Sequence, residues 1–195
     1  IALLEHPEKM TKEKHAEILE GLNAIRKRSK GIAAFMDSYR QLSKVPVPDF
    51  RMVPASRLVD NVGQFMKNIF ESRDIHFSCY LSRKNIAIWC DEKLIEHVLI
   101  NLLHNAADAL ENIPSPEIQL SVTELPDRID ISVHDNGPGI HPEIIDNIFV
   151  PFFTTKPEGT GIGLSLSRQI MNLHGGSIFV HSRKGNTVFT LDFLR

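Results

Sequence analysis

The chain has 195 residues, of which 24% are charged and 42% hydrophobic, and its formal net charge is −2. This length corresponds to one ordinary domain with an appendage and is sufficient to bury a sizeable core. The balanced charge excludes the basic surface typical of nucleic-acid-binding proteins, so we expect no nucleic-acid partner. No uninterrupted apolar run approaches the roughly 18 residues that a membrane span needs, so we expect no membrane segment in this chain.

The cysteines and the first residues of the sequence indicate the cellular compartment and the extent of the protein. Cys79 and Cys90 lie in apolar surroundings without a CxxC spacing, which predicts buried free thiols and a reducing cytoplasm. No signal-peptide pattern is found. The sequence begins at Ile1 without a start methionine, so we expect it to be a fragment of a longer protein.

The first predicted element is one long helix over residues 11–44. Apolar residues recur there at alternating steps of four and three, which is a heptad pattern, and Pro46 and Pro48 end it. The members of this seam are Ile18, Leu22, Ile25, Ser29, Ile32, Met36 and Tyr39. A stripe so regular but so short is typical of one member of a helix bundle. Glycines within it disfavour an independent dimeric coiled coil.

Residues 46–54 are punctuated by proline and predict a linker between residues 1–45 and a second domain over residues 55–195. The helices predicted in this domain are 55–71, 92–110 with Asp91 as its cap, and 164–173, and the predicted strands are 75–81, 86–90, 117–123, 128–134, 177–181 and 187–193. The last four strands are expected to form two hairpins. We therefore predict an α+β fold, a two-layer sandwich of a mixed sheet with helices on one face, preceded by one long helix.

Two asparagines, Asn101 and Asn105, are four residues apart and therefore lie on one face of the 92–110 helix. A neutral amide oxygen is a hard ligand that suits Mg²⁺, which keeps most of its shell as water and nucleotide phosphates. We therefore predict Asn105 as a metal ligand. Both asparagines share their stripe with apolar residues, which disfavours the alternative that they merely face solvent.

A glycine-rich turn, residues 135–140, reads DNGPGI and follows a predicted strand. The carboxylate of Asp135 can accept a hydrogen bond from the exocyclic amine of adenine, which guanine does not offer at that position. Gly137 and Gly139 are expected to adopt a positive φ and to let the backbone approach the base, with Ile140 beside it. Taken alone, the segment is equally compatible with a plain hairpin loop.

A second glycine-rich segment, residues 159–164, reads GTGIGL and opens the 164–173 helix. Free N–H groups and the positive end of the helix dipole predict an anion cradle there. The segment does not follow a strand, as a Rossmann fingerprint does, and it lacks the Lys-Ser/Thr pair of a P-loop. The residues predicted to bind nucleotide are Gly159, Thr160, Gly161, Ile162, Gly163 and Leu164.

In this order and spacing, the segment with Asn101 and Asn105, the 135–140 turn and the 159–164 segment resemble the N, G1 and G2 boxes of sensor histidine kinases. Gyrase, Hsp90 and MutL share the same arrangement of the ATP pocket. The resemblance covers residues 55–193 and is closest to the nitrogen-regulation type. It implies that the chain binds ATP and Mg²⁺. It also implies a catalytic set of Asn101, Asn105 and Lys156.

Residues 148–156 read IFVPFFTTK and resemble the F box of this family. The resemblance implies that the aromatic residues anchor a lid and that Lys156 reaches the phosphates. The lid is expected to be short, because only Pro157 and Glu158 separate Lys156 from the G2 segment. Thr187 matches the threonine that supports Asp135 and adenine, partly through water, although a threonine in a strand needs no such role.

The sequence departs from the family pattern at Asp108, where many members carry a Lys or Arg that meets phosphate. Asp108 is expected either to order waters of the Mg²⁺ ion or to balance charge facing solvent. Asn101 departs from the hydrolytic relatives, which place a glutamate there to activate water. Because an amide cannot take a proton, we expect transfer of the phosphoryl group rather than hydrolysis of ATP.

The 11–44 helix resembles the second helix of the dimerisation and phosphotransfer hairpin of these kinases. The resemblance implies that ATP phosphorylates a histidine on the first helix of that hairpin and that the phosphoryl group then passes to a response regulator. Neither His6 nor His15 stands in the expected His-Glu/Asp box, in which the carboxylate acts as general base. We expect the acceptor helix to precede residues 1–10, so the chain alone should not phosphorylate itself.

The partners implied are ATP or ADP, a cognate response regulator, the protein's own phosphoacceptor helix and a second protomer. The expected location is the cytoplasm, either as a free protein or as the cytoplasmic part of a membrane-bound sensor. Two alternatives stay open: a nucleotide-dependent interaction module without phosphotransfer, and a related serine-directed kinase.

Overall fold

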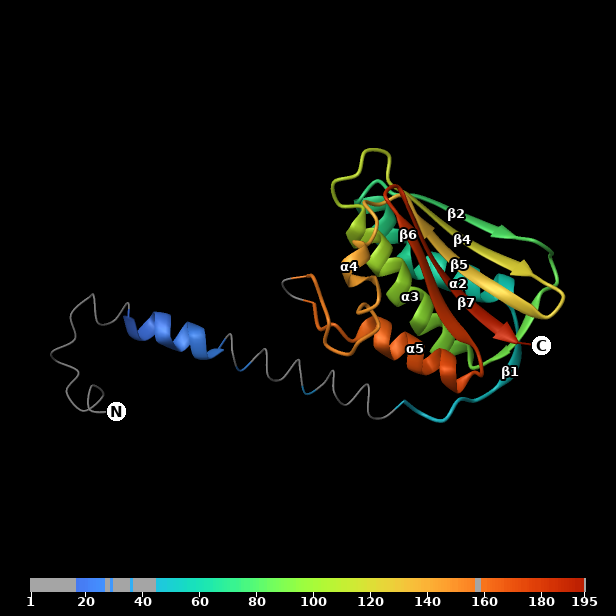
Figure 1. The fold of residues 1–195 in the computed structure, drawn as a ribbon, viewed down its shortest axis with the longest axis horizontal. Coiled ribbons are helices and arrows are strands. Elements are labelled where there is room, and N and C mark those ends of the chain that lie inside the picture. Colours follow the sequence, from blue (N-terminus) through green and yellow to red (C-terminus); the bar gives the residue numbers. More distant parts are fainter. Residues whose placement is uncertain (1–16, 27–28, 30–35, 37–44, 157–158, 195) are drawn as a thin grey trace. The chain divides into compact units, whose positions relative to one another are not determined.

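A computed structural model describes residues 17–26, 29, 36, 45–156 and 159–194, and the chain divides into two compact units, 1–43 and 44–195 (Figure 1). In the first unit, residues 17–26 are helical, within the predicted 11–44 helix, most of whose other residues lie outside the described ones. Two residues of the predicted seam, Leu22 and Ile25, are 56% and 63% exposed, and the neighbouring Leu19 is 49% exposed. This short helix therefore presents an apolar stripe.

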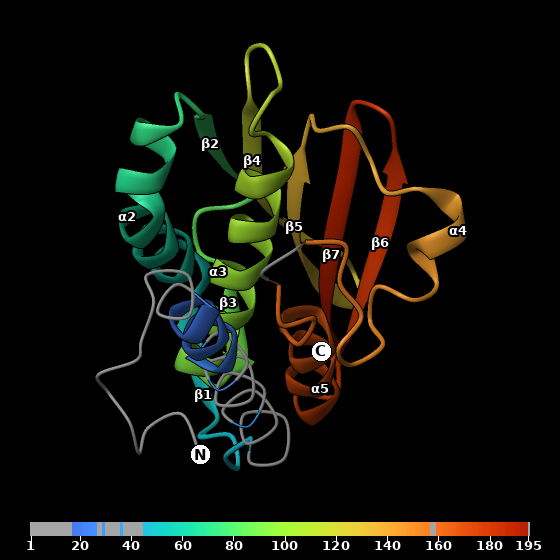
Figure 2. The same ribbon diagram turned by 90° about the vertical axis from the view of Figure 1, so that its left-hand side faces the viewer.

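The second unit is built on a five-stranded sheet with the order β2-β4-β5-β7-β6, in which only the β2–β4 pair is parallel. Its strands are β2 (His76–Leu81), β4 (Glu117–Glu124), β5 (Arg128–Asp135), β6 (Ser177–Arg183) and β7 (Asn186–Leu194). Its long helices are α2 (Ala55–Ser72), α3 (Glu92–Ala109) and α5 (Gly163–Leu173). All three cover one face of the sheet (Figures 1 and 2). The α+β prediction, a mixed sheet with helices on one face, is confirmed.

The hydrophobic core lies between the buried face of the sheet and the apolar faces of the helices that cover it. Residues along β4, β5 and β7 alternate between buried and more accessible positions, as strands with one covered face do. Buried residues of α2 recur at helical spacing and face the sheet. Among these buried residues of α2 are Leu58, Val62, Met66 and Phe70. Phe70 stacks on Phe77 of β2 with ring centroids 4.7 Å apart, which fixes the end of α2 against the sheet edge.

Helices α2 and α3 run side by side in the same direction (Figure 2). Three polar pairs join them, and in each pair the partners are 35 residues apart in the sequence. The pairs are Arg57 with Glu92, Asn61 with Glu96, and Arg73 with Asp108. A constant offset is what two parallel helices of equal pitch produce, so α2 positions its last pair next to the C-terminal turn of α3.

Two short elements were not predicted. Strand β1 (Arg51–Pro54) lies within the predicted 46–54 linker and pairs antiparallel with β3 (Ala87–Cys90) in a separate two-stranded sheet. The linker prediction is therefore wrong from residue 51 onward, because pairing with a distant strand overrides the local proline signal. Helix α4 (Pro142–Ile145) forms a single turn after the G1 segment.

The two cysteines differ in environment. Cys90 is buried, as predicted, whereas Cys79 is exposed, because β2 is an edge strand of the sheet. The prediction of a buried thiol is therefore wrong for Cys79. In the described residues, none of the helices is both long and apolar enough to cross a membrane.

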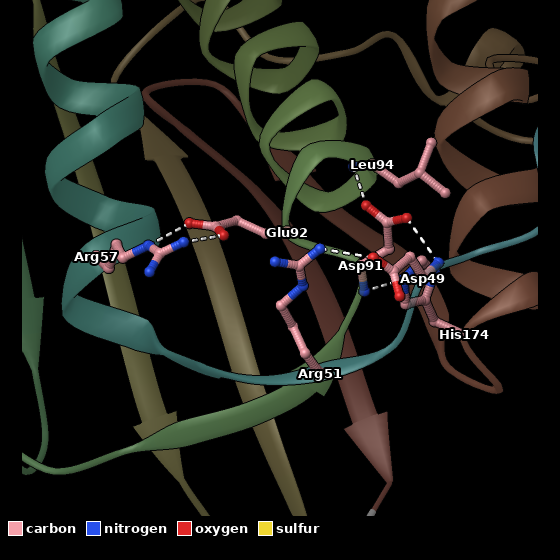
Figure 3. A network of polar contacts seen from close by, with 7 residues as sticks. All are labelled: Asp49, Arg51, Arg57, Asp91, Glu92, Leu94 and His174. Carbon is pink, nitrogen blue, oxygen red and sulfur yellow. Dashed lines mark hydrogen bonds and ion pairs between the residues drawn. The ribbon is translucent and has the colours of Figure 1, made fainter.

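The start of α3 is tied to the segment that leads into β1 (Figure 3). The Asp91 carboxylate accepts a hydrogen bond from the Leu94 N–H at 3.1 Å, which is the predicted helix cap, and another from the Asp49 N–H at 2.8 Å. The Asp91 N–H donates to Nε2 of His174 at 3.0 Å, so the proton of this ring lies on Nδ1, which faces the Ile170 carbonyl at 2.8 Å. One carboxylate therefore anchors both the chain before β1 and the helix that carries the predicted asparagines.

Candidate functional site

The three predicted segments converge on α3, because this helix packs against both β5 and α5. β5 ends at Asp135, where the G1 segment begins, and α5 begins at Gly163 within the G2 segment. Asn101 and Asn105 lie in the second half of α3. The fold therefore brings segments more than 50 residues apart to one helix.

Asp135 is only 4% exposed, and its Oδ1 accepts a hydrogen bond from the Gly137 N–H at 2.9 Å. Burial raises the pKa of Asp135, an effect that the Gly137 N–H and the neighbouring His134 reduce only in part. A Cβ on Gly137 would lie 2.7 Å from Asp135 Oδ1. Gly137 is thus needed for this close approach and not for a positive φ, so that part of the prediction is wrong.

The G1 turn rests on the turn between β6 and β7. Gly139 has the predicted positive φ of 85°, and a Cβ there would lie 2.8 Å from the carbonyl atoms of Arg183. The Gly185 N–H donates to the Gly137 carbonyl at 2.9 Å. The closing hairpin therefore holds the turn in place, and the chain itself explains why glycine is needed at position 139.

Thr187 lies opposite Asp135 in the β5–β7 register and is 4% exposed. Its hydroxyl hydrogen-bonds with that of Ser182 at 2.9 Å, and Ser182 Oγ accepts from the Ile140 N–H at 2.8 Å. Thr187 is thus connected to the far end of the G1 turn through Ser182. Sequence reasoning missed Ser182, because its role depends on the β6–β7 register.

Asn101 joins α3 to the first turn of α5. Its Nδ2 donates to Ser167 Oγ at 3.0 Å, and Ser167 donates to the Gly163 carbonyl at 2.9 Å. A Cβ on Gly163 would lie 2.1 Å from Asn101 Oδ1, so any larger residue there would displace the Asn101 side chain. The structure therefore places Asn101 Oδ1 directly against the start of α5.

The G2 segment is held against the F box. Gly161 has φ 68°, and a Cβ there would lie 2.4 Å from the carbonyl carbon of Phe152, whose N–H donates to the Gly161 carbonyl at 2.9 Å. Among the described residues, no side chain caps the first turn of α5 after Ile162, which leaves this helix end suited to an anion. Ile162 is 2% exposed, Leu164 is half-buried, and Thr160 is exposed.

The F-box end of the lid is folded on itself. Thr154 Oγ1 accepts a hydrogen bond from the Lys156 N–H at 3.1 Å, and the Gly159 N–H donates to the Lys156 carbonyl at 3.1 Å. A Cβ on Gly159 would lie 2.3 Å from Thr154 Oγ1. Pro157 and Glu158, the two residues of the predicted short lid, lie outside the described residues.

Four side chains form a polar cluster at the C-terminal end of α3. Lys156 Nζ donates to Asn105 Oδ1 at 3.1 Å and to Asp108 Oδ2 at 2.7 Å, and Arg73 Nη1 donates to Asp108 Oδ1 at 2.8 Å. Partial burial alone would raise the pKa of Asp108. The hydrogen bonds and charges of Lys156 and Arg73 outweigh that effect and keep its pKa below the usual range. Arg73 belongs to no motif, and sequence reasoning missed it.

The donor set of this cluster suits a cation. Asn105 Oδ1 and Asp108 Oδ2 together hold an ammonium group, so these two oxygens already bind positive charge. Hard oxygen donors of this kind are also the ligands that Mg²⁺ prefers. The described residues contain no group of three or more His, Cys, Asp or Glu side chains that could hold a metal ion. The predicted Mg²⁺ site therefore depends on Asn105 and on the phosphates of the nucleotide.

Residues 90–195 match the protein family described as histidine kinase-, DNA gyrase B- and HSP90-like ATPase. The chain belongs to this family. The match includes the N, G1, F and G2 boxes and the closing hairpin, so the family resemblance is confirmed. α2 and Arg73, the residue that follows it, lie before the matched residues.

Individual relatives are sensor histidine kinases. The sensory histidine kinase/phosphatase NtrB of Rhizobium leguminosarum bv. phaseoli is 35% identical over 146 residues, which cover 68% of this chain and 38% of that protein. The signal transduction histidine-protein kinase AtoS of Escherichia coli (strain K12) is 32% identical over 174 residues, 88% of this chain and 28% of that protein. The chain is thus similar to sensor histidine kinases, as predicted.

The catalytic domain of histidine kinase ThkA superimposes with a TM-score of 0.69 and 32% identity, covering 75% of this chain and 95% of that structure. This histidine kinase-like chain therefore carries an ATP-binding catalytic domain. It spans 26% to 38% of the length of the curated relatives that it matches.

Proposed function

We propose that this chain binds Mg-ATP and transfers its γ-phosphoryl group to a histidine, for relay to an aspartate of a response regulator. In this reaction an imidazole nitrogen attacks the γ-phosphorus, the bond to the β,γ-bridging oxygen breaks, and ADP leaves. Family membership and the similarity to sensor histidine kinases support the proposal. The acceptor histidine would lie on a helix preceding this chain.

The observation that carries the proposal is the buried carboxylate of Asp135. Its Oδ1 is engaged by the Gly137 N–H, and the second oxygen can accept a hydrogen bond from the exocyclic amine of adenine. A buried carboxylate is unfavourable unless it has partners. An adenine amine would satisfy the remaining oxygen, whereas the carbonyl of guanine would repel it.

Asn105 is the proposed protein ligand of Mg²⁺, together with phosphate oxygens of the nucleotide. The ion would neutralise charge on the phosphates during transfer. Lys156 holds the same Asn105 oxygen, so we propose that its ammonium group moves to the phosphates when the metal is bound. The first-turn N–H groups of α5 would bind the phosphates from the other side.

Asn101 supports phosphotransfer over hydrolysis. Its amide is fixed by Ser167 and cannot accept a proton from water, so the site offers no general base at this position. The γ-phosphoryl group is therefore kept for the histidine. Thr187 and Ile140 would complete the adenine side through the Ser182 hydroxyl.

We further propose that residues 1–45 are half of a dimerisation hairpin and that residues 55–195 are the catalytic domain. The exposed apolar stripe of residues 17–26 supports a helical partner, namely the acceptor helix and a second protomer. The proposed location is the cytoplasm, as a free protein or as part of a membrane-bound sensor.

The full-length protein that contains this chain, incubated with [γ-³²P]ATP and Mg²⁺, tests the proposal. The expected label is acid-labile and base-stable, as phosphohistidine is, and Asn105→Ala should remove at least about nine-tenths of it. An acid-stable label would indicate a serine-directed kinase instead. Nucleotide binding without any label would indicate an interaction module.

A further inference from the structure

Arg73 differs in position from the other residues that join α2 to α3. Two of the polar pairs between these helices lie at Glu92 and Glu96, in the first two turns of α3. The third pair, Arg73 with Asp108, lies in the last turn, three residues after Asn105. Residues three apart share a helix face, so this pair alone adjoins the proposed metal and phosphate end of the site.

The charges at this end do not cancel. Asp108 receives Arg73 Nη1 at 2.8 Å on one oxygen and Lys156 Nζ at 2.7 Å on the other. Two cations around one carboxylate give the cluster a net charge of +1. Without Arg73, the charges of Lys156 and Asp108 would cancel and the cluster would be neutral. Arg73 therefore determines whether the cluster beside Asn105 has a net positive charge or none.

A purely structural role would explain little of this arrangement. The side chains of Arg73 and Asp108 are 42% and 37% exposed, and ion pairs so accessible contribute at most about 1 kcal/mol to stability. A guanidinium group has five N–H donors, and Asp108 is its hydrogen-bond partner among the described residues. Donors therefore remain for an anion at a position that Asp108 has fixed.

We propose that Arg73 is a specificity-determining residue of the phosphate site. Held by Asp108, it makes the Asn105 end of the pocket net positive and so favours the triphosphate of ATP. The proposal rests on the proposed ATP-binding function and assigns to Arg73, at the C-terminal end of α2, the cation that α3 lacks at position 108. Asp108 is then the residue that positions Arg73.

The test compares Mg-ATP with adenosine, measured by calorimetric titration into this chain and into three variants. Arg73→Ala should weaken Mg-ATP binding about tenfold and leave adenosine binding unchanged, because adenosine has no phosphate. Arg73→Lys keeps the charge and should restore most of the ATP affinity. Asn61→Ala removes another α2–α3 pair and is the matched control, for which neither ligand should change.

Three outcomes would overturn the inference. Unchanged ATP affinity in Arg73→Ala would show that the charge does not act on the phosphates. An equal loss for ATP and adenosine would show that Arg73 only holds the helices together. If the unmodified chain bound no ATP, the proposed function would fail as well, and this result is distinct from the other two.

Discussion

At the scale of single residues, the site depends on groups held in positions that are unfavourable for the fold itself. The Asp135 carboxyl group is buried at 4% exposure, and burial raises its pKa. Gly163 leaves no room for a Cβ, because Asn101 Oδ1 would lie 2.1 Å away. Such local costs are typical of sites whose geometry serves a ligand.

Replacing Asp135 with asparagine should therefore stabilise the free protein. At neutral pH the folded wild-type chain carries a buried charge, and the variant does not, so the midpoint of thermal unfolding should rise by a few degrees. The variant keeps an oxygen that can accept from the Gly137 N–H. Melting curves of both proteins without nucleotide check this.

The pH dependence of that difference has a definite sign. As the pH falls through the raised pKa of folded Asp135, the folded wild-type takes up a proton before the unfolded chain does, and its stability rises toward that of the variant. The advantage of Asp135→Asn should thus be largest near neutral pH and vanish in acid. A difference that grows in acid would contradict the assigned burial cost.

Most residues of the proposed nucleotide site lie in motifs that are visible in the sequence. Asn105, Asp135 and the G2 glycines stand in motifs whose spacing indicates their chemistry. Arg73, Ser167 and Ser182 could not be found in that way. Their contacts depend on the offset between α2 and α3, on the α3–α5 packing and on the β6–β7 register, none of which is local in the sequence.

At the scale of elements, α2, α3, α5 and the two hairpins could be predicted because their hydrophobic periodicity is strong. β1 and α4 could not be predicted, since β1 lies in a proline-flanked stretch and α4 is a single turn of four residues. β1 is specified by pairing with β3, which is distant in the sequence, and not by its own proline-flanked residues. α3 is the central element, because it carries the asparagines and contacts α2, α5 and β5.

The start of α3 gives a test of how the chain before β1 is anchored. Asp91→Asn should keep the helix cap, since asparagine caps well, but lose one carboxylate oxygen as acceptor for the Asp49 N–H. Amide hydrogen exchange should therefore accelerate about tenfold at Asp49 and stay slow at Leu94. Asp91→Ala should accelerate both and lower stability by about 1 kcal/mol.

The matched control for that experiment is Arg51→Ala, which removes a neighbouring exposed ion pair with Asp49 and leaves Asp91 intact. It should change neither amide. Unchanged exchange at Asp49 in both Asp91 variants would show that this carboxylate does not anchor the segment before β1.

At the scale of the whole molecule, the unit 44–195 contains every residue of the proposed ATP site. The unit 1–43 contains the exposed apolar stripe of residues 17–26. The chain covers 26% to 38% of its relatives' length, and the proposed function places the acceptor histidine outside this chain. Binding of ATP is thus the step that this chain should perform alone.

The most direct measurement is calorimetric titration of Mg-ATP into this chain, with Asp135→Asn as its partner. We predict one binding site in the wild-type chain and an affinity about tenfold to a hundredfold lower in the variant, the value of one hydrogen bond to a charged group. The variant's higher melting midpoint would show that it remains folded. Equal binding by both proteins, or no binding by either, would contradict the adenine site on which the account depends.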